Sequence, residues 1–166
     1  MMQYPRTIRN FNGFIDGVSY AGRIIEGKAP DLKLSLAAHR GGGMDGIVNQ
    51  DMGMEAMKAE ATFAEWSPAL ITLFGTRRRM VLRPAAMGED DFSADTNIMT
   101  LGGRWSSTDF GSLKPGSDAP LKVTLEVDYF RMVQNNVELF EIDVRAGKRV
   151  VNGVDQLAQL RASMGL

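Results

Sequence analysis

Few residues in this chain are of a type that does chemistry, and the first is its single histidine. His39 follows an alternating run and precedes a glycine-rich loop, a place where catalytic residues often lie. The chain has no cysteine and no serine in a Gly-x-Ser-x-Gly turn, so it offers no pairing of a nucleophile with a base. One histidine with carboxylates is also an uncommon ligand set for zinc. We therefore interpret His39 as a structural or incidental residue, and no cofactor is implied.

Two short motifs each allow a chemical and a structural interpretation. Gly41, Gly42 and Gly43 suggest phosphate binding, but no Lys-Ser/Thr pair follows and the next element is expected to be extended. We interpret them as a flexible hairpin tip. The basic cluster at residues 77–79 has no interleaved aromatic residue and follows an expected helix, where positive charge is favourable in itself. We interpret it as a solvated cap, with contact to nucleic acid or an acidic partner as the alternative.

The carboxylates are scattered along the chain rather than paired. Those at residues 89–91 lie in a turn-rich stretch, which predicts an exposed loop. Glu126 and Asp128 alternate with apolar residues and so share the polar face of a strand. If that face lined a closed pore, it would form a ring of negative charge that repels DNA phosphates and lets DNA slide. This ring is a hypothesis.

Length and composition are those of an ordinary globular protein. We expect one domain over residues 1–166, with 44% hydrophobic and 23% charged residues and a formal net charge of -1. There is thus no overall basic field to hold nucleic acid. The absence of cysteine excludes disulfides and thiolate sites. No run is long enough for a transmembrane helix and the start lacks a signal peptide, so we expect cytoplasmic synthesis without a membrane anchor.

Alternating residues and turn signals predict a β-rich first half. Asp16 and Gly17 between β-formers predict a hairpin over residues 11–20. Residues 31–37 alternate strictly and predict a half-buried strand, with a loop from Arg40 to Asp51. Residues 54–63 also alternate, and we favour a strand there over a rival helix because a hairpin loop precedes them.

The second half is predicted to hold one short helix, more strands and a helical tail. Ser67 and Pro68 predict the start of a helix of about two turns that ends near Gly75. Strands are expected over residues 80–83, 98–105 and 121–132, the last returning through an Asn-Asn turn into residues 137–144. A bulge is expected at residues 102–103. The whole is a mostly β fold of sandwich or barrel type, with one short flanking helix and a helical C-terminal tail.

Six motifs in order, from residue 12 to the end, resemble the major tail tube protein of contractile-tailed phages and R-type tailocins. They are the first hairpin, an Arg-x-Gly-Gly-Met-Asp loop at residues 40–46, the segment 51–57, and the stretches 129–131, 138–143 and 151–157 before a Gly-Leu end. Each motif alone is weak, and their order and spacing are specific. The resemblance is least over residues 76–120.

The resemblance implies a non-enzymatic protein whose copies form hexameric rings that stack into a tube. Strands 31–39 and 54–63 are the expected hairpin of a shared inner barrel, with these inner-barrel residues: Leu32, Leu34, Leu36, Met57, Lys58 and Glu60. The loop between them is expected to reach a neighbouring ring through Arg40, Gly41, Gly42, Gly43, Met44, Asp45, Met52 and Met54. The expected C-terminal docking residues are Val154, Leu157, Leu160, Met164 and Leu166.

The resemblance also implies partners and a location. The expected partners are further copies of the chain, a tail sheath protein, and tape-measure, baseplate and terminator proteins, with DNA passing through the lumen without specific binding. The expected location is the virion tail, after assembly in the host bacterial cytoplasm. Two alternatives stay open: the tube protein of a type VI secretion system, and a small β-barrel binding module or enzyme that uses His39 or the glycine loop.

Overall fold

The computed structural model describes residues 2–166 and is built almost wholly from β-strands, as the sequence predicted. The first six strands are β1 (Thr7–Ile15), β2 (Val18–Ser19), β3 (Ile24–Lys28), β4 (Leu34–His39), β5 (Val48–Met54) and β6 (Met57–Phe63). Helix α1 (Pro68–Ile71) separates them from β7 (Arg77–Met87), β8 (Ala94–Asp109) and β9 (Leu121–Gln134). Strands β10 (Val137–Asp143), β11 (Lys148–Val151) and β12 (Val154–Asp155) precede α2 (Ala158–Ser163).

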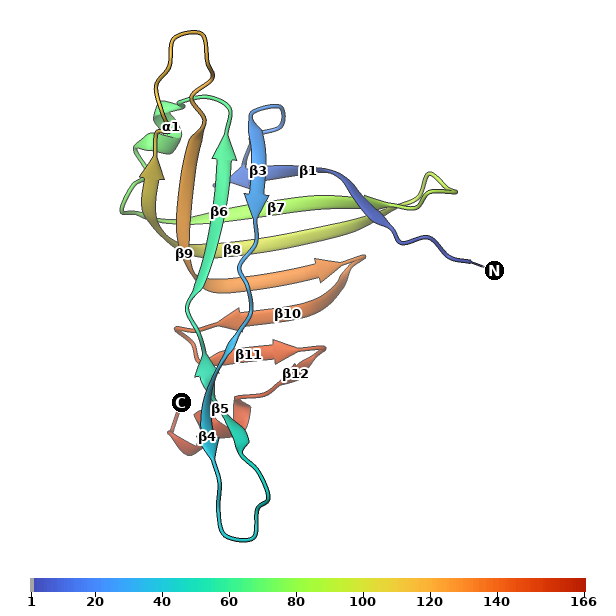
Figure 1. Cartoon of the computed structure of the whole chain (residues 1–166), viewed down its shortest axis with the longest axis vertical. Coiled ribbons are helices and arrows are strands. Elements are labelled where there is room, and N and C mark those ends of the chain that lie inside the picture. Colours follow the sequence, from blue (N-terminus) through green and yellow to red (C-terminus); the bar gives the residue numbers. More distant parts are fainter. Residues whose placement is uncertain (1) are drawn as a thin grey trace.

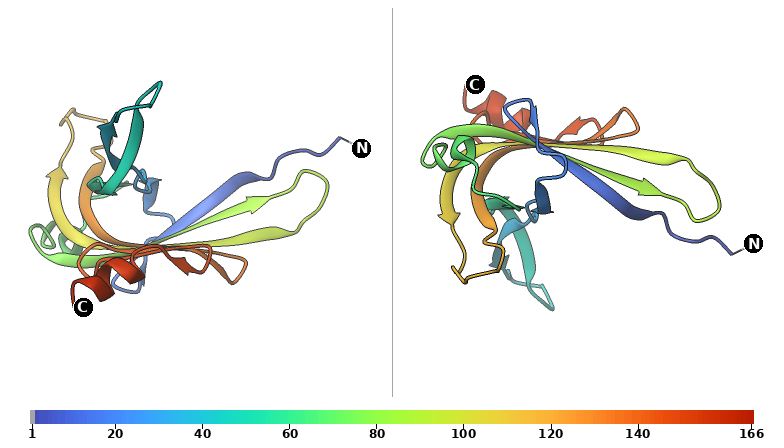
Figure 2. Two further views of the ribbon diagram at one scale, coloured as in Figure 1. Left: turned by 90° about the horizontal axis from the view of Figure 1, so that it is seen from below. Right: turned by 90° about the horizontal axis from the view of Figure 1, so that it is seen from above.

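One antiparallel sheet of ten strands carries the fold, and its long strands are bent (Figure 1). The main path runs β12-β11-β10-β9-β8-β7-β1-β2. The first half of β9 pairs with β6, which pairs with β3, whereas the second half pairs with β10. Strands β8 and β9 therefore belong to both regions of the sheet. Figure 2 shows that one region curls into a half-barrel while the β7–β8 hairpin extends away from it.

The core lies inside the curled region. Its large, fully buried side chains come from β6 to β9 and from α1: Trp105, Phe63, Met57, Leu70, Met80, Leu101, Leu121 and Leu125. Alternate residues of β6 and β9 face inward and supply most of this surface. Helix α1 seats Leu70 against the strands. It is a single turn, shorter than the two turns predicted, and Phe74 lies exposed beyond it.

A β-bulge explains one error in the predicted strand faces. Val123, Leu125 and Val127 are buried as predicted, but the next buried residue is Phe130 rather than Tyr129. The β8–β9 register shifts between Gly102 and Gly103, the bulge that the glycine pair predicted. The extra residue reverses which face is inward, so the side-chain alternation does not persist across the bend.

Two other elements differ from the predictions. The strand expected to end near Pro84 continues through it to Met87. Pro84 has no partner residue in the β7–β8 register, so the missing N–H of the proline breaks no hydrogen bond of that ladder. The Pro84 carbonyl accepts a hydrogen bond from the side-chain amide of the buried Asn97 at 3.2 Å.

The basic cluster at residues 77–79 forms the start of strand β7, so it is not a helix cap.

Candidate assembly surfaces

The β4–β5 hairpin projects from the molecule and has no strand partner among the described residues outside itself. It forms a separate two-stranded sheet, and Figure 2 shows it on the opposite side of the main sheet from α2. Leu34, Leu36, Val48 and Met52 all expose large apolar surface; Leu36, for example, is 55% exposed. A two-stranded hairpin is marginally stable by itself in water. This apolar surface is therefore available to a partner molecule.

The structure corrects the predicted pairing of this hairpin. The partner of β4 is β5, and the strand at residues 57–63 (β6) pairs instead with β3 and β9. The loop is correspondingly shorter than predicted, because β5 begins at Val48 and the loop ends before it. Met52 and Met54 lie in β5, not in the loop. The choice of a strand over a helix for residues 57–63 is confirmed.

The loop between β4 and β5 presents a different apolar residue from the one predicted. Met44 is partly buried, and its sulfur accepts a hydrogen bond from the Gly41 N–H at 3.0 Å. Gly43 lies in this turn with a positive φ of 82°, which glycine adopts without strain. Arg40, Gly42 and Asp45 are exposed. Ile47, which sequence reasoning missed, is 65% exposed and is the apolar residue at this end of the hairpin.

The base of the hairpin is held by a buried arginine. Arg149 of β11 is buried, and its guanidinium donates to both carboxylate oxygens of Asp51 in β5. Asp51 also accepts the Gly53 N–H at 2.9 Å. These contacts lower the pKa of Asp51, the Arg149 hydrogen bond contributing most. An apolar hollow of about 200 Å³ beside them is lined by Leu32, Leu34, Met54 and residues of β10 and β11.

The predicted inner-barrel residues are divided among different environments. Met57 lies in the core of the chain itself, so it cannot line a lumen. On the outer face of β6 and β9, Lys58 pairs with Glu126 at 3.4 Å and Lys122 pairs with Glu60 at 3.3 Å. Asp128 pairs with Arg77. The carboxylates of this face are thus matched by cations within the subunit. A ring of negative charge around a pore stays a prediction.

The C-terminal segment is tied at its beginning and exposed at its end. Arg161 donates to the Gly147 carbonyl at 2.8 Å and pairs with Asp155. The Arg161 hydrogen bond lowers the pKa of Asp155 to about 2. Of the predicted docking residues Leu157 is half-buried, whereas the others are exposed: Val154, Leu160, Met164 and Leu166. Their apolar surface remains available to a second molecule.

In the described part of the chain, the remaining residues of catalytic or metal-binding type do not lie together. His39 lies exposed at the end of β4, and within residues 2–166 no three His, Asp or Glu side chains gather as a metal site. No helix of this described part is long and apolar enough to cross a bilayer. The acidic residues 89–91 lie in the loop between β7 and β8, as predicted. In the basic cluster at residues 77–79, Arg78 forms an ion pair with Asp16 at 3.3 Å.

The described chain thus combines a bent, mostly β fold with a projecting apolar hairpin. The chain belongs to the family of the phage tail tube protein FII, whose model matches residues 5–165. It is 30% identical to the tail tube protein of Escherichia phage P2, over 99% of this chain and 100% of that protein. It is 27% identical to the major tail tube protein of Serratia phage KSP20, over 86% and 85% of the two chains.

A solved structure also matches. A chain of the 6-fold symmetrised cryo-EM structure of the anti-feeding prophage baseplate is similar with a TM-score of 0.49 and 17% identity, over 80% of this chain and 97% of that one. The family membership and the named relatives assign this chain a structural role in a tail tube, and it is not an enzyme.

Proposed function

We propose that copies of this chain form hexameric rings that stack into the inner tube of a contractile phage or phage-derived tail. One observation carries the proposal: the β4–β5 hairpin exposes apolar residues and has no strand partner in the described part of its own subunit. Association with neighbouring copies would cover this surface and extend a sheet that is marginal alone. The tube then conducts DNA during delivery, or punctures a target membrane when the sheath contracts.

Each exposed surface takes a part in this assembly. The hairpin end, with Arg40, Gly41, Gly42, Gly43, Met44 and Asp45, contacts the next ring, and the exposed Ile47 adds apolar area there. Strand β4, with Leu34 and Leu36, pairs around the inner barrel and closes sheet edges that would otherwise invite aggregation. The end of the chain, from Leu157 to Leu166, docks on an adjacent subunit.

The charge balance of the β6–β9 face fits a conduit better than a binding surface. Its lysines and glutamates are paired across the strands, so a wall built from it has little net charge. Such a wall holds no DNA phosphates firmly, because salt-dependent binding needs unpaired cations. Lys58 and Glu60, expected at the inner barrel, lie on this face. DNA would pass without specific binding.

The partners follow from the place of a tube inside a tail. They are further copies of the chain, a sheath protein around the tube, a tape-measure protein within it, and baseplate and terminator proteins at its two ends. We treat residues 1–166 as a single tail tube domain, made in the cytoplasm of a bacterial host and assembled into the virion tail.

Negative-stain electron microscopy of the purified protein over a concentration series tests the proposal. Rings or tubes with a central channel are the expected result. If the protein stays a featureless monomer even with a baseplate extract present to nucleate it, the tube function is overturned. The rival binding module predicts that stable monomer, together with a ligand-binding activity that is lost in His39→Ala.

A further inference from the structure

The loop between β7 and β8, residues 88–93, ends a long hairpin that extends away from the core (Figure 2). Phe92 in this loop is 97% exposed, more than any other large hydrophobic residue in the described part of the chain. Aromatic side chains bury large areas and anchor protein interfaces. The β7–β8 hairpin with this loop, here called the arm, therefore presents at its end an aromatic residue suited to anchor a protein interface.

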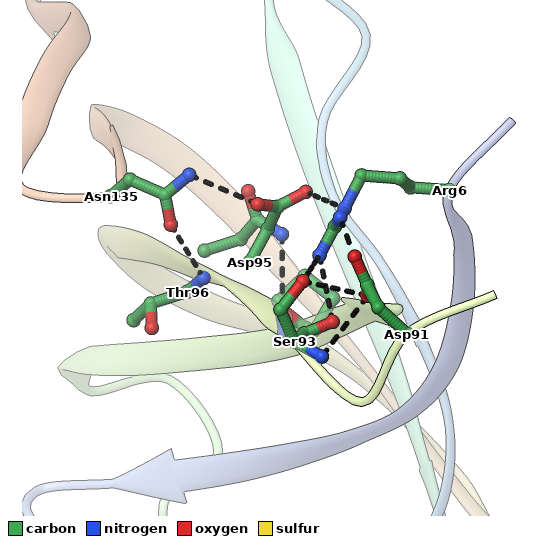
Figure 3. A network of polar contacts seen from close by, with 8 residues as sticks. Arg6, Asp91, Ser93, Asp95, Thr96 and Asn135 are labelled. Carbon is green, nitrogen blue, oxygen red and sulfur yellow. Dashed lines mark hydrogen bonds and ion pairs between the residues drawn. The ribbon is translucent and has the colours of Figure 1, made fainter. Parts of the chain in front are cut away.

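The arm is held in one shape by a network of polar contacts (Figure 3). Arg6 donates to the Ser93 carbonyl at 2.7 Å and pairs with Asp95 at 2.7 Å. Asp91 accepts hydrogen bonds from the Ser93 N–H and hydroxyl at 3.1 and 2.7 Å. Asn135, in the turn after β9, donates to Asp95 at 3.1 Å. These contacts hold the loop in place before binding, which reduces the entropy lost on docking.

The end of the arm keeps a negative charge. Arg9 pairs with Glu89 at 2.6 Å and Arg6 neutralises Asp95, but Asp90 has no ion-pair partner within residues 2–166. Asp91 lies at the outer limit of an ion pair with Arg6, at 4.0 Å. The arm therefore offers an exposed aromatic ring beside unbalanced carboxylates.

The opposite charge gathers at the other end of β7. An open depression of about 600 Å³ is lined by Arg77, Arg79, Asp128, Tyr129, Asp143, Arg145 and Ala146. Arg77 is balanced by Asp128, and Asp143 accepts the N–H groups of Arg145 and Ala146 at 3.1 Å each. Arg79 and Arg145 have no ion-pair partner in the described chain, so the lining keeps an excess of positive charge. The Arg79 guanidinium lies 5.8 Å from the centre of the Tyr129 ring. A surface of arginines beside a tyrosine fits an aromatic ring flanked by carboxylates.

We propose that the β7–β8 arm of one copy docks, through Phe92 and Asp90, into the Arg79–Arg145 depression of a second copy. The two surfaces lie at opposite ends of one eleven-residue strand, about 35 Å of extended chain, so they cannot meet within one molecule. When each copy contacts two different neighbours, the contact is head-to-tail and closes into a ring if the rotation between copies is a fraction of a full turn, whereas a reciprocal two-fold contact would stop at a dimer. The inference rests on the proposed self-assembly and names the contact that drives it.

The charges of the two surfaces favour a second copy of the chain as the molecule that binds the depression. The arm and the depression occur once each per chain, with complementary charge and one apolar anchor, so every docking event leaves a new arm and a new depression free. An unrelated acidic protein would leave the arm itself without a partner. Binding of another protein to the depression, with no contact between copies, is the competing outcome of the experiment.

Cross-linking through introduced cysteines tests the contact directly, because the natural chain has none. A chain carrying Ser93→Cys and Ala146→Cys, next to the contact residues but leaving Phe92, Asp90 and Arg145 in place, is assembled and treated with a short bismaleimide. We expect a ladder of covalent oligomers on a denaturing gel. The matched control carries Ser93→Cys with Lys114→Cys, in an exposed loop outside the depression, and should give no ladder.

Charge reversal supplies the second measurement. Asp90→Arg and Arg145→Glu each should raise the concentration needed for assembly by at least about tenfold, the effect of a modest interface residue. The chain carrying both changes should recover most of this loss. Normal rings in both single charge variants, together with rings but no ladder from the double-cysteine chain, would overturn the arm contact while leaving the tube function intact. A wild-type chain that never assembles would overturn both.

Discussion

Arg149 in β11 donates hydrogen bonds to both carboxylate oxygens of Asp51 in β5, which lies 98 positions away in the chain. Arg149 is buried, whereas Asp51 is partly exposed at the base of the projecting hairpin. This pair and the apolar hollow that Leu34 and Met54 share with β10 and β11 orient the β4–β5 hairpin relative to the C-terminal strands. The pair is the charged part of that attachment.

Replacing Asp51 by Asn should loosen the hairpin, because the buried guanidinium loses its counter-charge. We expect the amides of β4 and β5 to exchange with deuterium faster, while those of β8 and β9 are unchanged. Hydrogen exchange with mass spectrometry measures this difference. Asp45→Asn, in the loop of the same hairpin and with no ion pair in the described chain, is the control, and equal exchange in both variants would contradict the assigned role of Asp51.

The hairpin end should control stacking without affecting the fold. Met44→Asp and Ile47→Asp place a charge where a neighbouring ring is expected to contact apolar surface. We expect the Ile47→Asp monomer to unfold at the wild-type temperature, within about 2 °C, because an exposed position contributes little to stability. Met44→Asp should unfold slightly lower, because it also loses the contact of the Met44 sulfur with the Gly41 N–H. Tubes should be absent or short by electron microscopy, and more so for Ile47→Asp because Met44 is partly buried. Tubes of normal length in both variants would refute the stacking role of the loop.

A large difference in stability should separate two leucines that sequence alone does not distinguish. Leu101→Ala should destabilise the subunit by about 2–5 kcal/mol, because Leu101 is fully buried in the core. Leu36→Ala should change the free energy of unfolding by less than about 0.5 kcal/mol, because Leu36 is largely exposed in the monomer. Urea unfolding of the monomer gives both values. A large loss for Leu36→Ala would mean that the hairpin is packed within its own subunit.

The bulge at Gly103 should tolerate no side chain. A Cβ built on Gly103 would lie 1.9 Å from the Glu126 carbonyl oxygen, a backbone atom that cannot move without displacing β9. Gly103→Ala should therefore destabilise the fold by about 3 kcal/mol. At Gly102 the nearest atom to such a Cβ is the Tyr129 Cβ at 3.3 Å, so Gly102→Ala should be milder. Thermal unfolding compares them, and equal effects would contradict this account.

Acid should release the C-terminal segment. The pKa of Asp155 is lowered from 3.8 to about 2 by Arg161, so its pairing contributes stability above its ordinary pKa and loses it as the pH falls from about 4 to 2. Asp155→Asn removes the carboxylate at every pH. The unfolding temperatures of wild type and variant should thus differ at pH 7 and converge near pH 2. A difference that persists unchanged in acid would refute the assignment.

The sequence predicted the elements that have strong local signals. Asp16–Gly17 and Asn135–Asn136 turn the chain with positive φ angles, as such residues allow, and the hairpins lie where they were expected. The glycine pair predicted the bulge between β8 and β9. The fold class followed from these local features.

Strand β5 was not predicted because few of its residues indicate a strand. Asparagine, glutamine, aspartate and glycine are poor or neutral strand formers, the apolar Val48 and Met52 are exposed, and only Met54 packs against the core. The partner of β4 was consequently misplaced by one strand. The tie from Asp51 to Arg149 spans the chain and has no local signal, and Phe92 stands alone in an acidic loop. Such features depend on tertiary contacts or on neighbouring molecules.

Because β8 and β9 pass through both regions of the sheet, the subunit has a preferred direction of mechanical strength. They pair along most of their length, from Asn97–Gln134 to Asp109–Lys122. A pull along these strands must shear many hydrogen bonds together, whereas a pull on a hairpin end opens them one after another. Traction parallel to β8 and β9 is therefore resisted by the whole ladder, and the subunit yields most easily when it is peeled from its edges.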